Sequence, residues 1–528
     1  MDICSKLQSI EPQEGFYLLH TDNALIKLCF VTDEIVRIRA SFDKDLAEES
    51  YILLTTAWED RLDPLFAGER TRLTPVKAGL KETEDAVFFS TAEVTLRVDR
   101  DPLNFTLCDA DGNILYRALS GCPFVKDSNG RVIAYSEMKE DDCFYGFGEK
   151  AGLLNKNKKF LRERATDAMG YDPEYTDTLY KHVPFYLRLD RDTHKAVGVF
   201  YHNFYESVFN MGCEKSNYWH RYSYFQADGG DIDCFLIGGD TIPRIVDNYT
   251  MLTGRPCLLP KRALGYQASS MYYPELEKDC DDAIYDFVDT IRENDFPLDG
   301  FHLSSGYTSY NNKRCVFTWN TTRFKDPQKY LRTMKEQHAQ NVPNVKPGIL
   351  LCHPYFADFE RAGVFVQDSH DQDTYGVGRW WGGDGAFWDF TSPQARALWK
   401  KYLTDAIIDV GTDSVWNDNC EYDSLMDKDC RCNFDGKGGT IGQLKPLMST
   451  LMCKIGAEAV QEHDANARPY MVCRSGSAGI QHYAQTWCGD NATSWRTLQF
   501  NIPMILSMGL SGQPNDGAPQ GGSAASTM

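Results

Sequence analysis

Hydrophobic and polar positions alternate in short runs through the first half of the chain. The clearest runs are ALIKLCFV, IVRIRASF, AVFFSTAEVTLRV and AVGVFYHNF, and Asp, Gly, Asn and Pro residues separate them. A period of two residues is typical of strands with one buried face, and the intervening residues favour turns. The pattern therefore predicts an N-terminal β-sandwich domain over residues 1–255.

The rhythm changes near Pro260, where short apolar runs begin to alternate with helical segments. The apolar runs are ALGYQAS, LDGFHL, KPGILL, DSVWND, PYMVCRS, TWCGD and IPMILSMGLSG. The helical segments are LEKDCDDAIYDFVDTIREN, DPQKYLRTMKEQHA, SPQARALWKKYLTDAII and IGQLKPLMSTLMCKIGAEAVQEH. A βα repeat predicts a parallel sheet, and about seven strands in order predict a (β/α)₈ TIM-type barrel that lacks its last strand, over residues 256–514.

The end of the chain has no periodic pattern. Residues 515–528 are rich in Gly, Ala, Ser and Pro, which predicts a disordered low-complexity tail. A barrel without its eighth strand has two unpaired sheet edges, so we expect the isolated chain to fold poorly and to be a shortened product of a longer gene.

The length and the net charge of the chain make some classes of function less suitable than others. The 528 residues exceed one ordinary domain, and 55 Lys and Arg against 75 Asp and Glu give a net charge of −20. Long-range repulsion disfavours nucleic acid and anionic membrane surfaces as partners, so a neutral substrate fits better.

The amino terminus, MDICSKLQSIEPQEGF, lacks a secretory pattern, and no apolar stretch of about 18 residues follows it, which predicts a cytoplasmic protein. The seventeen cysteines show no paired zinc spacing, and Cys430 and Cys432 have no second cluster beside them. Without a P-loop, a GxGxxG after a strand or an HExxH motif, we expect no metal and no cofactor.

Carboxylates end two of the predicted barrel strands. Asp418 follows the strand in VWNDNCEYD, with Glu421 after it, and Asp490 closes QTWCGDNATSW in the same way. Reactive side chains of parallel barrels project from these strand ends, and cleavage of a glycosidic bond requires one carboxyl group as acid and another facing the oxocarbenium charge. The alternative is that each Asp caps the following helix.

Aromatic residues and one arginine accompany these carboxylates. Trp380, Trp416 and Trp487 lie near the predicted strand ends, and exposed indole rings commonly stack on the apolar faces of pyranoses. Arg474 closes PYMVCRS and is either a structural ion-pair partner or a ligand of sugar hydroxyls.

The chain resembles glycoside hydrolase family 31, the retaining α-glycosidases, from about residue 140 to about residue 514. The resemblance rests on FYGFGEKAGLL, RATDAMGYD, LYKHVPFYL, GYQASSMYY, FPLDGFHL, FTWNTTRFKDP, FWDFTSPQAR, VWNDNCEYD, CRSGSAG and WCGDNATSW, which follow in family order. It implies that Asp418 is the nucleophile, Asp490 the general acid/base, Arg474 a ligand of the reacting sugar and Glu421 a supporting carboxylate beside the nucleophile.

The chain departs from this family at the second strand. The family usually carries DxDYM there, and its first Asp holds the 4-hydroxyl of a glucose-like sugar. Here the segment reads LSSGYT, so that Ser304 and Gly306 replace the carboxylates and Tyr307 is kept. By this resemblance, Ser304 and Tyr307 are expected among the substrate-binding residues. A neighbouring acid, Asp167 or Asp172, is the alternative source of that contact. The family's eighth strand, sugar-binding His and distal β domains, which follow GLSGQPN, are absent.

These observations predict a retaining exo-α-glycosidase of the α-glucosidase type that acts on a small carbohydrate. The alternatives within the class are an α-galactosidase or α-N-acetylgalactosaminidase, for which Ser304 leaves room, and an α-transglycosylase. The alternative outside the class is an inactive carbohydrate-binding remnant.

Overall fold

The computed structural model describes residues 1–380 and 382–517, and these divide into two compact units. The first unit contains Met1–Pro256, Ser477–His482 and residues 488–517. The second contains Cys257–Gly476 and Tyr483–Trp487. The boundary at Pro256 lies next to the predicted end of the sandwich. The grouping of residues 488–517 with the first unit differs from the predicted division.

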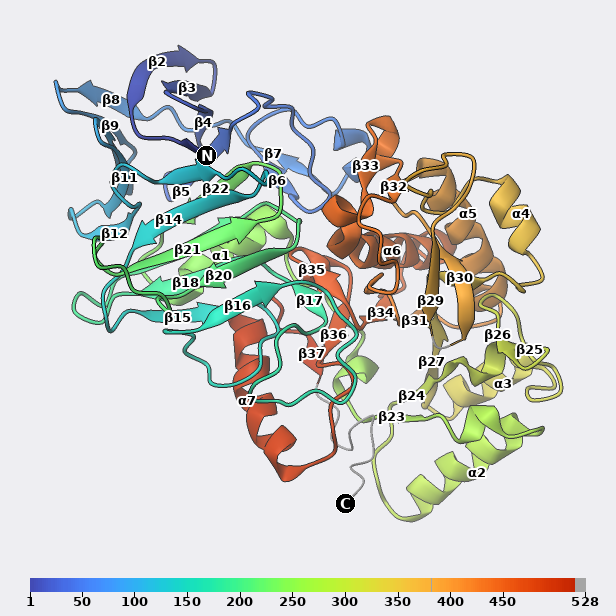
Figure 1. The fold of residues 1–528 in the computed structure, drawn as a ribbon. Coiled ribbons are helices and arrows are strands. Elements are labelled where there is room, and N and C mark those ends of the chain that lie inside the picture. The colour runs from blue at the N-terminus through green and yellow to red at the C-terminus, as the bar shows by residue number, and fades with distance from the viewer. Residues whose placement is uncertain (381, 518–528) are drawn as a thin grey trace. The chain divides into compact units, whose positions relative to one another are not determined.

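Three antiparallel sheets form most of the first unit (Figure 1). The eight-stranded sheet has the order β15 (Cys143–Gly146), β18 (Phe185–Leu189), β19 (Ala196–Tyr201), β22 (Ile232–Ile237), β5 (Ile35–Ser41), β4 (Leu25–Phe30), β3 (Phe16–Thr21), β2 (Leu7–Gln13). The six-stranded sheet has the order β1 (Asp2–Ile3), β13 (Phe124–Lys126), β14 (Val132–Glu137), β21 (Tyr222–Ala227), β20 (Ser207–Asn210), β16 (Phe160–Glu163). The five-stranded sheet has the order β12 (Ile114–Arg117), β11 (Leu103–Asp109), β10 (Val94–Arg100), β9 (Ala86–Ser90), β8 (Gly79–Glu82).

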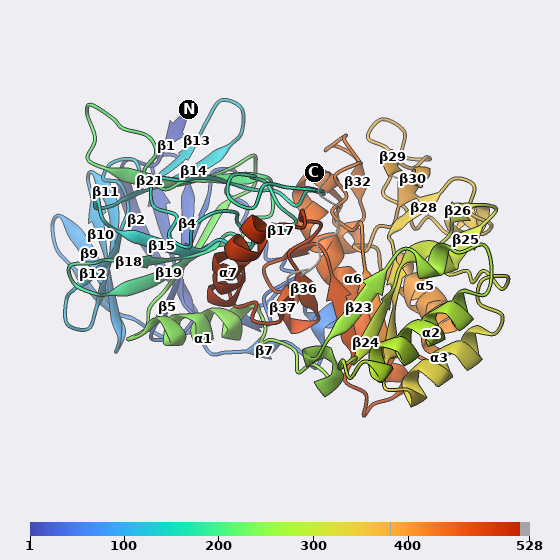
Figure 2. The ribbon, with the colours of Figure 1, turned by 90° about the horizontal axis from the view of Figure 1, so that it is seen from below.

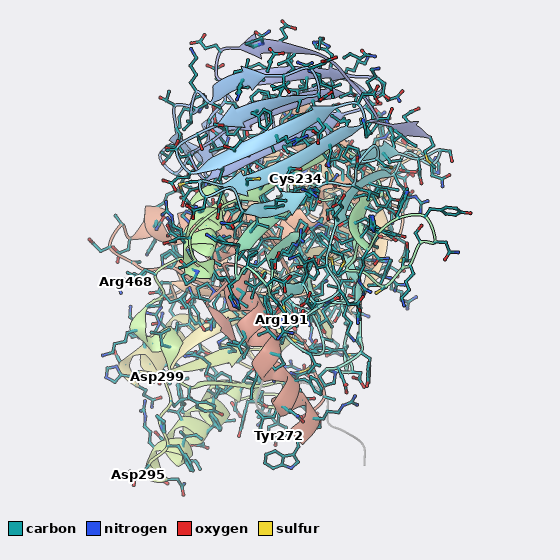
Figure 3. The ribbon with its side chains drawn as sticks, turned by 90° about the vertical axis from the view of Figure 1, so that its left-hand side faces the viewer. Arg191, Cys234, Tyr272, Asp295, Asp299 and Arg468 are labelled. Carbon is teal, nitrogen blue, oxygen red and sulfur yellow. The ribbon has the colours of Figure 1, made fainter. Side chains whose placement is uncertain are left out.

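Alternating residues of these strands form a common core. In β10 the side chains of Val94, Leu96 and Val98 are buried, and they belong to one apolar cluster with residues of the other two sheets. Cys234 of β22 is part of the same cluster and is labelled among the strands in Figure 3. The predicted N-terminal β-sandwich is therefore confirmed, and its period of two residues reflects burial on one face.

Helices α1 (Ile242–Thr253) and α7 (Trp495–Leu510) also belong to the first unit. The run IPMILSMGLSG, counted above with the strands, lies in α7, because Ser494 caps a long helical segment by accepting a hydrogen bond from the Thr497 amide at 3.0 Å. The Ser507 hydroxyl donates to the Gly146 carbonyl at 2.6 Å, which anchors α7 beside β15.

The predicted disordered tail begins with an ordered segment. Asp516–Gly517 form β37, and the amide of Cys488 donates to the Gly517 carbonyl at 2.9 Å. Residues 518–528 of that tail lie outside the described residues.

Parallel strands and helices alternate in the second unit (Figure 2). Six strands pair in chain order: β23 (Gln267–Ser270), β24 (Gly300–Leu303), β27 (Gln340–Val345), β31 (Ser414–Asn417), β34 (Tyr470–Cys473), β36 (Gln485–Trp487). The helices between them are α2 (Cys280–Glu293), α3 (Pro327–Glu336), α4 (Phe356–Arg361), α5 (Pro393–Leu403) and α6 (Ile441–His463). This unit confirms the predicted parallel β/α architecture. Within the part of the chain that the structure describes, no helix is both long enough and apolar enough to cross a bilayer.

The third barrel strand is not the one predicted. The run KPGILL contributes β28 (Gly348–Leu350), which pairs antiparallel with β30 (Gly383–Phe387), and β30 pairs with β29 (Val377–Trp380). The barrel strand is β27, which is completely buried although it contains Asn341 and Asn344. Both asparagines have tertiary hydrogen-bond partners, so burial does not leave their amides wholly unpaired.

Candidate active site

Three neighbouring strands of the barrel sheet each end at a charged residue. Val345 of β27 pairs in register with Asn417 of β31, and Asn417 pairs with Cys473 of β34. The next residue after each is Lys346, Asp418 and Arg474 respectively, so a carboxylate lies between two cations at one edge of the sheet. Residues at equivalent register positions of parallel strands project from the same face, which places these three side chains together.

The carboxylate of Asp418 is buried and asymmetrically bound. Oδ2 accepts a hydrogen bond from Asn344 Nδ2 at 3.1 Å and another from Lys346 Nζ. Oδ1 lies 3.4 Å from Arg474 Nε but accepts no hydrogen bond from the described residues. One oxygen is thus saturated by donors and the other remains available for chemistry.

The surroundings of Asp418 favour its ionised form. Burial alone would raise the pKa of the carboxyl group, but the charges of Lys346 and Arg474 outweigh burial and hold the pKa well below its usual range. Burial lowers the pKa of Lys346 below its usual value, although the neighbouring Asp418 acts in the opposite direction. Asp418 is therefore a carboxylate at neutral pH.

Glu421 and Arg474 form a buried bidentate ion pair. The two carboxylate oxygens of Glu421 accept from Arg474 Nε and a terminal nitrogen, each at 2.7 Å. This pairing uses the fixed fork of the guanidinium and holds it beside Asp418. The structure thus brings together the three residues Asp418, Glu421 and Arg474 that the sequence singled out.

The predicted aromatic residues separate into two groups. Trp416 of β31 and Trp487 of β36 meet edge to face with ring centroids 5.9 Å apart, and both pack against an apolar cluster that includes Val342 and Tyr470. The indole nitrogen of Trp416 is buried and has no hydrogen-bond partner among the described residues. Trp380 ends β29, and its side chain lies outside the described part of the chain.

Ser304 and Tyr307 follow β24 and differ in their partners. The Ser304 side chain is buried, and its hydroxyl has no hydrogen-bond partner among the residues that the structure describes. The Tyr307 hydroxyl donates to the Asn344 carbonyl at 2.8 Å, so this residue, predicted to bind substrate, supports the end of β27.

Asp490 and Asp172 belong to the first unit. The Asp490 amide donates to the Tyr180 hydroxyl at 3.1 Å, and its carbonyl accepts from the Gly170 amide at 2.7 Å. The carboxylate of Asp172 accepts from the amides of Glu174 and Tyr175 and forms an ion pair with Arg496 at 3.0 Å. The carboxylate of Asp172 is thus bonded to amides of its own loop and to Arg496 of α7.

Sequence reasoning missed Lys346 and Asn344, which hold the carboxylate. The signal was present, because a lysine directly follows a buried segment in the same way that Asp418 and Arg474 follow theirs. The hydrophobic pattern hides this signal, because the more apolar run KPGILL predicts the third barrel strand in place of QNVPNV.

The chain thus combines an N-terminal β-sandwich with a parallel β/α unit that presents a buried carboxylate at its strand ends. The model of the glycosyl hydrolases family 31 TIM-barrel domain matches residues 256–527, and that of the glycosyl hydrolase 31 N-terminal galactose mutarotase-like domain matches residues 25–210. The chain belongs to glycosyl hydrolase family 31.

Two of the relatives that this chain matches carry the name alpha-glucosidase. Alpha-glucosidase 2 of Bacillus thermoamyloliquefaciens is 30% identical over 535 residues, which cover 97% of this chain and 62% of that protein. Neutral alpha-glucosidase AB of Dictyostelium discoideum is 28% identical over 69% of this chain and 39% of its own length. The chain therefore spans less than two thirds of the length of these relatives.

The fold is also that of solved family members. The dextranase of Flavobacterium johnsoniae, in complex with glucose, superimposes with a TM-score of 0.87 at 21% identity and covers 99% of this chain and 62% of the dextranase chain. At that identity the likeness establishes the fold only.

Proposed function

We propose that this chain carries the catalytic part of a retaining exo-α-glycosidase, of the α-glucosidase type. The observation that carries the proposal is the Asp418 carboxylate, which lies between Lys346 and Arg474 and has one oxygen, Oδ1, that accepts no hydrogen bond from the residues that the structure describes. The names of the relatives in the family support the choice of α-glucosidase.

The proposed reaction proceeds in two displacements. Asp418 attacks the anomeric carbon, the glycosidic bond breaks with its electron pair on the leaving oxygen, and Asp490 protonates that oxygen. Water then attacks the anomeric carbon of the glycosyl ester, gives a proton to Asp490 and releases Asp418 as a carboxylate. Arg474 is proposed to bind the reacting sugar, with Trp416, Trp487 and Trp380 as the apolar surface around it.

Asp418→Asn tests the proposal directly. We expect kcat on an aryl α-glucoside to fall by several orders of magnitude, because the amide cannot form the glycosyl ester. The circular dichroism spectrum and thermal midpoint serve as controls for the fold. In the wild-type chain, a 5-fluoro-α-glucosyl fluoride should leave a covalent sugar on the peptide that contains Asp418. An active Asp418→Asn variant would contradict the assignment.

A second substrate class is favoured by Ser304. Its buried hydroxyl replaces the acid that would bind an equatorial 4-hydroxyl, and loss of a charge-assisted hydrogen bond typically costs about 1.5–3 kcal/mol. An α-galactoside or N-acetyl-α-galactosaminide, with an axial 4-hydroxyl, does not require that acid. Comparing kcat/KM for the aryl α-glucoside with kcat/KM for these two substrates decides between them.

Two alternatives to hydrolysis are transfer of the sugar to a second sugar and sugar binding without turnover. Transfer uses the same glycosyl ester and is distinguished from hydrolysis by its products. Sugar binding without turnover would identify an inactive carbohydrate-binding remnant.

We also propose a cytoplasmic location. All seventeen cysteines are free thiols, which suits a reducing compartment.

A further inference from the structure

Lys346 donates a hydrogen bond to the Asp418 carboxylate, and the family resemblance assigns this lysine no role. We propose that Lys346 is a positioning residue that holds Oδ2 of Asp418, leaves Oδ1 as the attacking oxygen, and stabilises the carboxylate as it departs from the glycosyl ester. This inference rests on the proposed function, since it requires Asp418 to be the nucleophile.

The contacts of the two carboxylate oxygens support the choice of Oδ1. Lys346 Nζ and Asn344 Nδ2 both donate to Oδ2, so the lone pairs of Oδ2 are engaged from the β27 side. Lys346 Nζ also donates to Asn419 Oδ1, which restricts where the ammonium group can move. The Arg474 Nε–H donates to Glu421 at 2.7 Å and Nε lies 3.4 Å from Oδ1 of Asp418, so Arg474 acts on Oδ1 mainly through its charge.

The register of the strands makes this arrangement rigid. Asn344 and Lys346 lie at the end of β27, Asp418 at the end of β31, and the Asp418 amide donates to the Val345 carbonyl at 3.0 Å. Only 5% of the Lys346 surface is exposed, so the ammonium group has little access to water and interacts strongly with the carboxylate.

The effect expected of Lys346 follows from the change in the charge of Asp418 in each displacement. In the first displacement a bond forms from Oδ1 to the anomeric carbon, and Asp418 loses its negative charge. In the second, that bond breaks and its electron pair returns to Asp418. A fixed ammonium group beside Oδ2 therefore slows attack somewhat but makes Asp418 a better leaving group.

The pKa of Asp418 depends on the charged groups that lie beside it. Lys346 approaches from β27 and Arg474 from β34, and Glu421 neutralises much of the Arg474 charge. Without Lys346, burial would no longer be offset to the same degree, and protonation of Asp418 would begin at higher pH.

The test compares Lys346→Met and Lys346→Arg with the wild-type chain, and Lys454→Met is the matched control. Lys454 is also buried and ion-paired in the second unit, with Glu458 at 2.7 Å, but belongs to α6 and to no part of the proposed machinery. Should Lys346→Met fail to fold, Lys346→Gln removes the same charge while keeping a donor for Oδ2.

We expect Lys346→Met to move the acid limb of kcat/KM upward by about one pH unit or more. We also expect slower release of the sugar from Asp418, seen as a burst of phenol from a dinitrophenyl α-glycoside and as glycosyl-enzyme in the intact mass. Lys346→Arg should keep the acid limb near the wild-type position, and Lys454→Met should change neither readout.

Two failures can be told apart. If wild-type enzyme turns over without forming an ester on Asp418, the proposed function of Asp418 is wrong and the role of Lys346 falls with it. If the ester forms on Asp418 but Lys346→Met leaves the acid limb and the burst unchanged, only the role of Lys346 is overturned.

Discussion

The two cations beside Asp418 are held in different ways. Arg474 is fixed by a bidentate contact with Glu421, whereas Lys346 bonds directly to the carboxylate and to Asn419. Two cations and two carboxylates give a cluster with no net charge, which limits the cost of burying four ionised groups. This group of four side chains is therefore neutral, which suits the neutral sugar proposed as substrate.

Replacing Asp490 by Asn should reveal its role through the leaving group. We expect kcat/KM to fall strongly for alkyl α-glycosides and far less for dinitrophenyl α-glycosides, because an acidic phenol departs without a proton. The measurement is a plot of log kcat/KM against leaving-group pKa, which should become steeper than in the wild-type chain. Equal losses for both kinds of leaving group would count against the acid role.

His182 should make the first unit less stable in acid. Burial lowers the pKa of this histidine from its usual 6.5 to about 4, so below pH 6.5 the unfolded chain binds a proton that the folded chain does not. Stability is then lost as pH falls from 6.5 towards 4. Between pH 6.5 and 5 the loss is about 2 kcal/mol, at about 1.4 kcal/mol per pH unit.

Urea unfolding at pH 7 and pH 5 measures this effect of His182. His182→Gln should show a smaller decrease in the free energy of unfolding between the two pH values than the wild-type chain, by about 2 kcal/mol. An identical decrease in both proteins would mean that His182 takes up its proton in the folded state.

Among the strands and helices, the buried strand β27 shows how polar residues in the interior position the site. Asn341 of β27 accepts from the Tyr330 hydroxyl at 2.9 Å, and Asn344 donates to Asp418, so the strand that looks least like a core strand positions the site. Helix α6, in contrast, begins and ends where the apolar pattern predicts, at Ile441 and His463. Local periodicity is reliable where a segment buries apolar side chains and fails where tertiary partners satisfy polar ones.

The N-cap of α7 offers a prediction at this scale. Ser494→Ala should lower the free energy of unfolding by about 1 kcal/mol, because the Thr497 amide loses its side-chain acceptor. Urea denaturation gives the value, and faster amide exchange is expected in the first turn of α7. Ser494→Asp, which retains an acceptor at the N-cap, should remain close to wild type, and a loss as large as that of alanine would argue against the cap.

The whole molecule is stabilised without disulfide bonds. All seventeen cysteines are free, and the neighbouring sulfur atoms of Cys420 and Cys473 are 3.6 Å apart, too far for a bond. The buried thiols have little contact with solvent, and burial raises the pKa of Cys29, for example, to about 11. Folding therefore depends on apolar packing, such as the core of the first unit, rather than on covalent links.

Thiol labelling tests this description of the molecule. In the native chain we expect only the two exposed thiols, Cys213 and Cys352, to react rapidly with Ellman's reagent, and all seventeen to react in denaturant. The thermal midpoint should be the same with and without dithiothreitol. Fewer than seventeen reactive thiols in denaturant without reductant would show that disulfides form in the purified protein.

The sandwich, the β/α repeat and most helices could be predicted from the sequence, which also singled out Asp418, Glu421 and Arg474 as candidates. These follow from periodicity and from polar residues directly after apolar runs, which are local properties of the chain. The resemblance to family 31 added roles, and the chain's membership of that family agrees with it.

The pairs of side chains that meet in the site could not be predicted from the sequence. The contacts of Asp418 with Asn344 and Lys346 join residues 74 and 72 positions apart, and they exist because β27 rather than the KPGILL run pairs with β31. The Tyr307 hydroxyl is likewise engaged by a carbonyl of β27. The physical reason is that strand register is a non-local property: it fixes which strand ends are neighbours, and hence which cation faces which carboxylate.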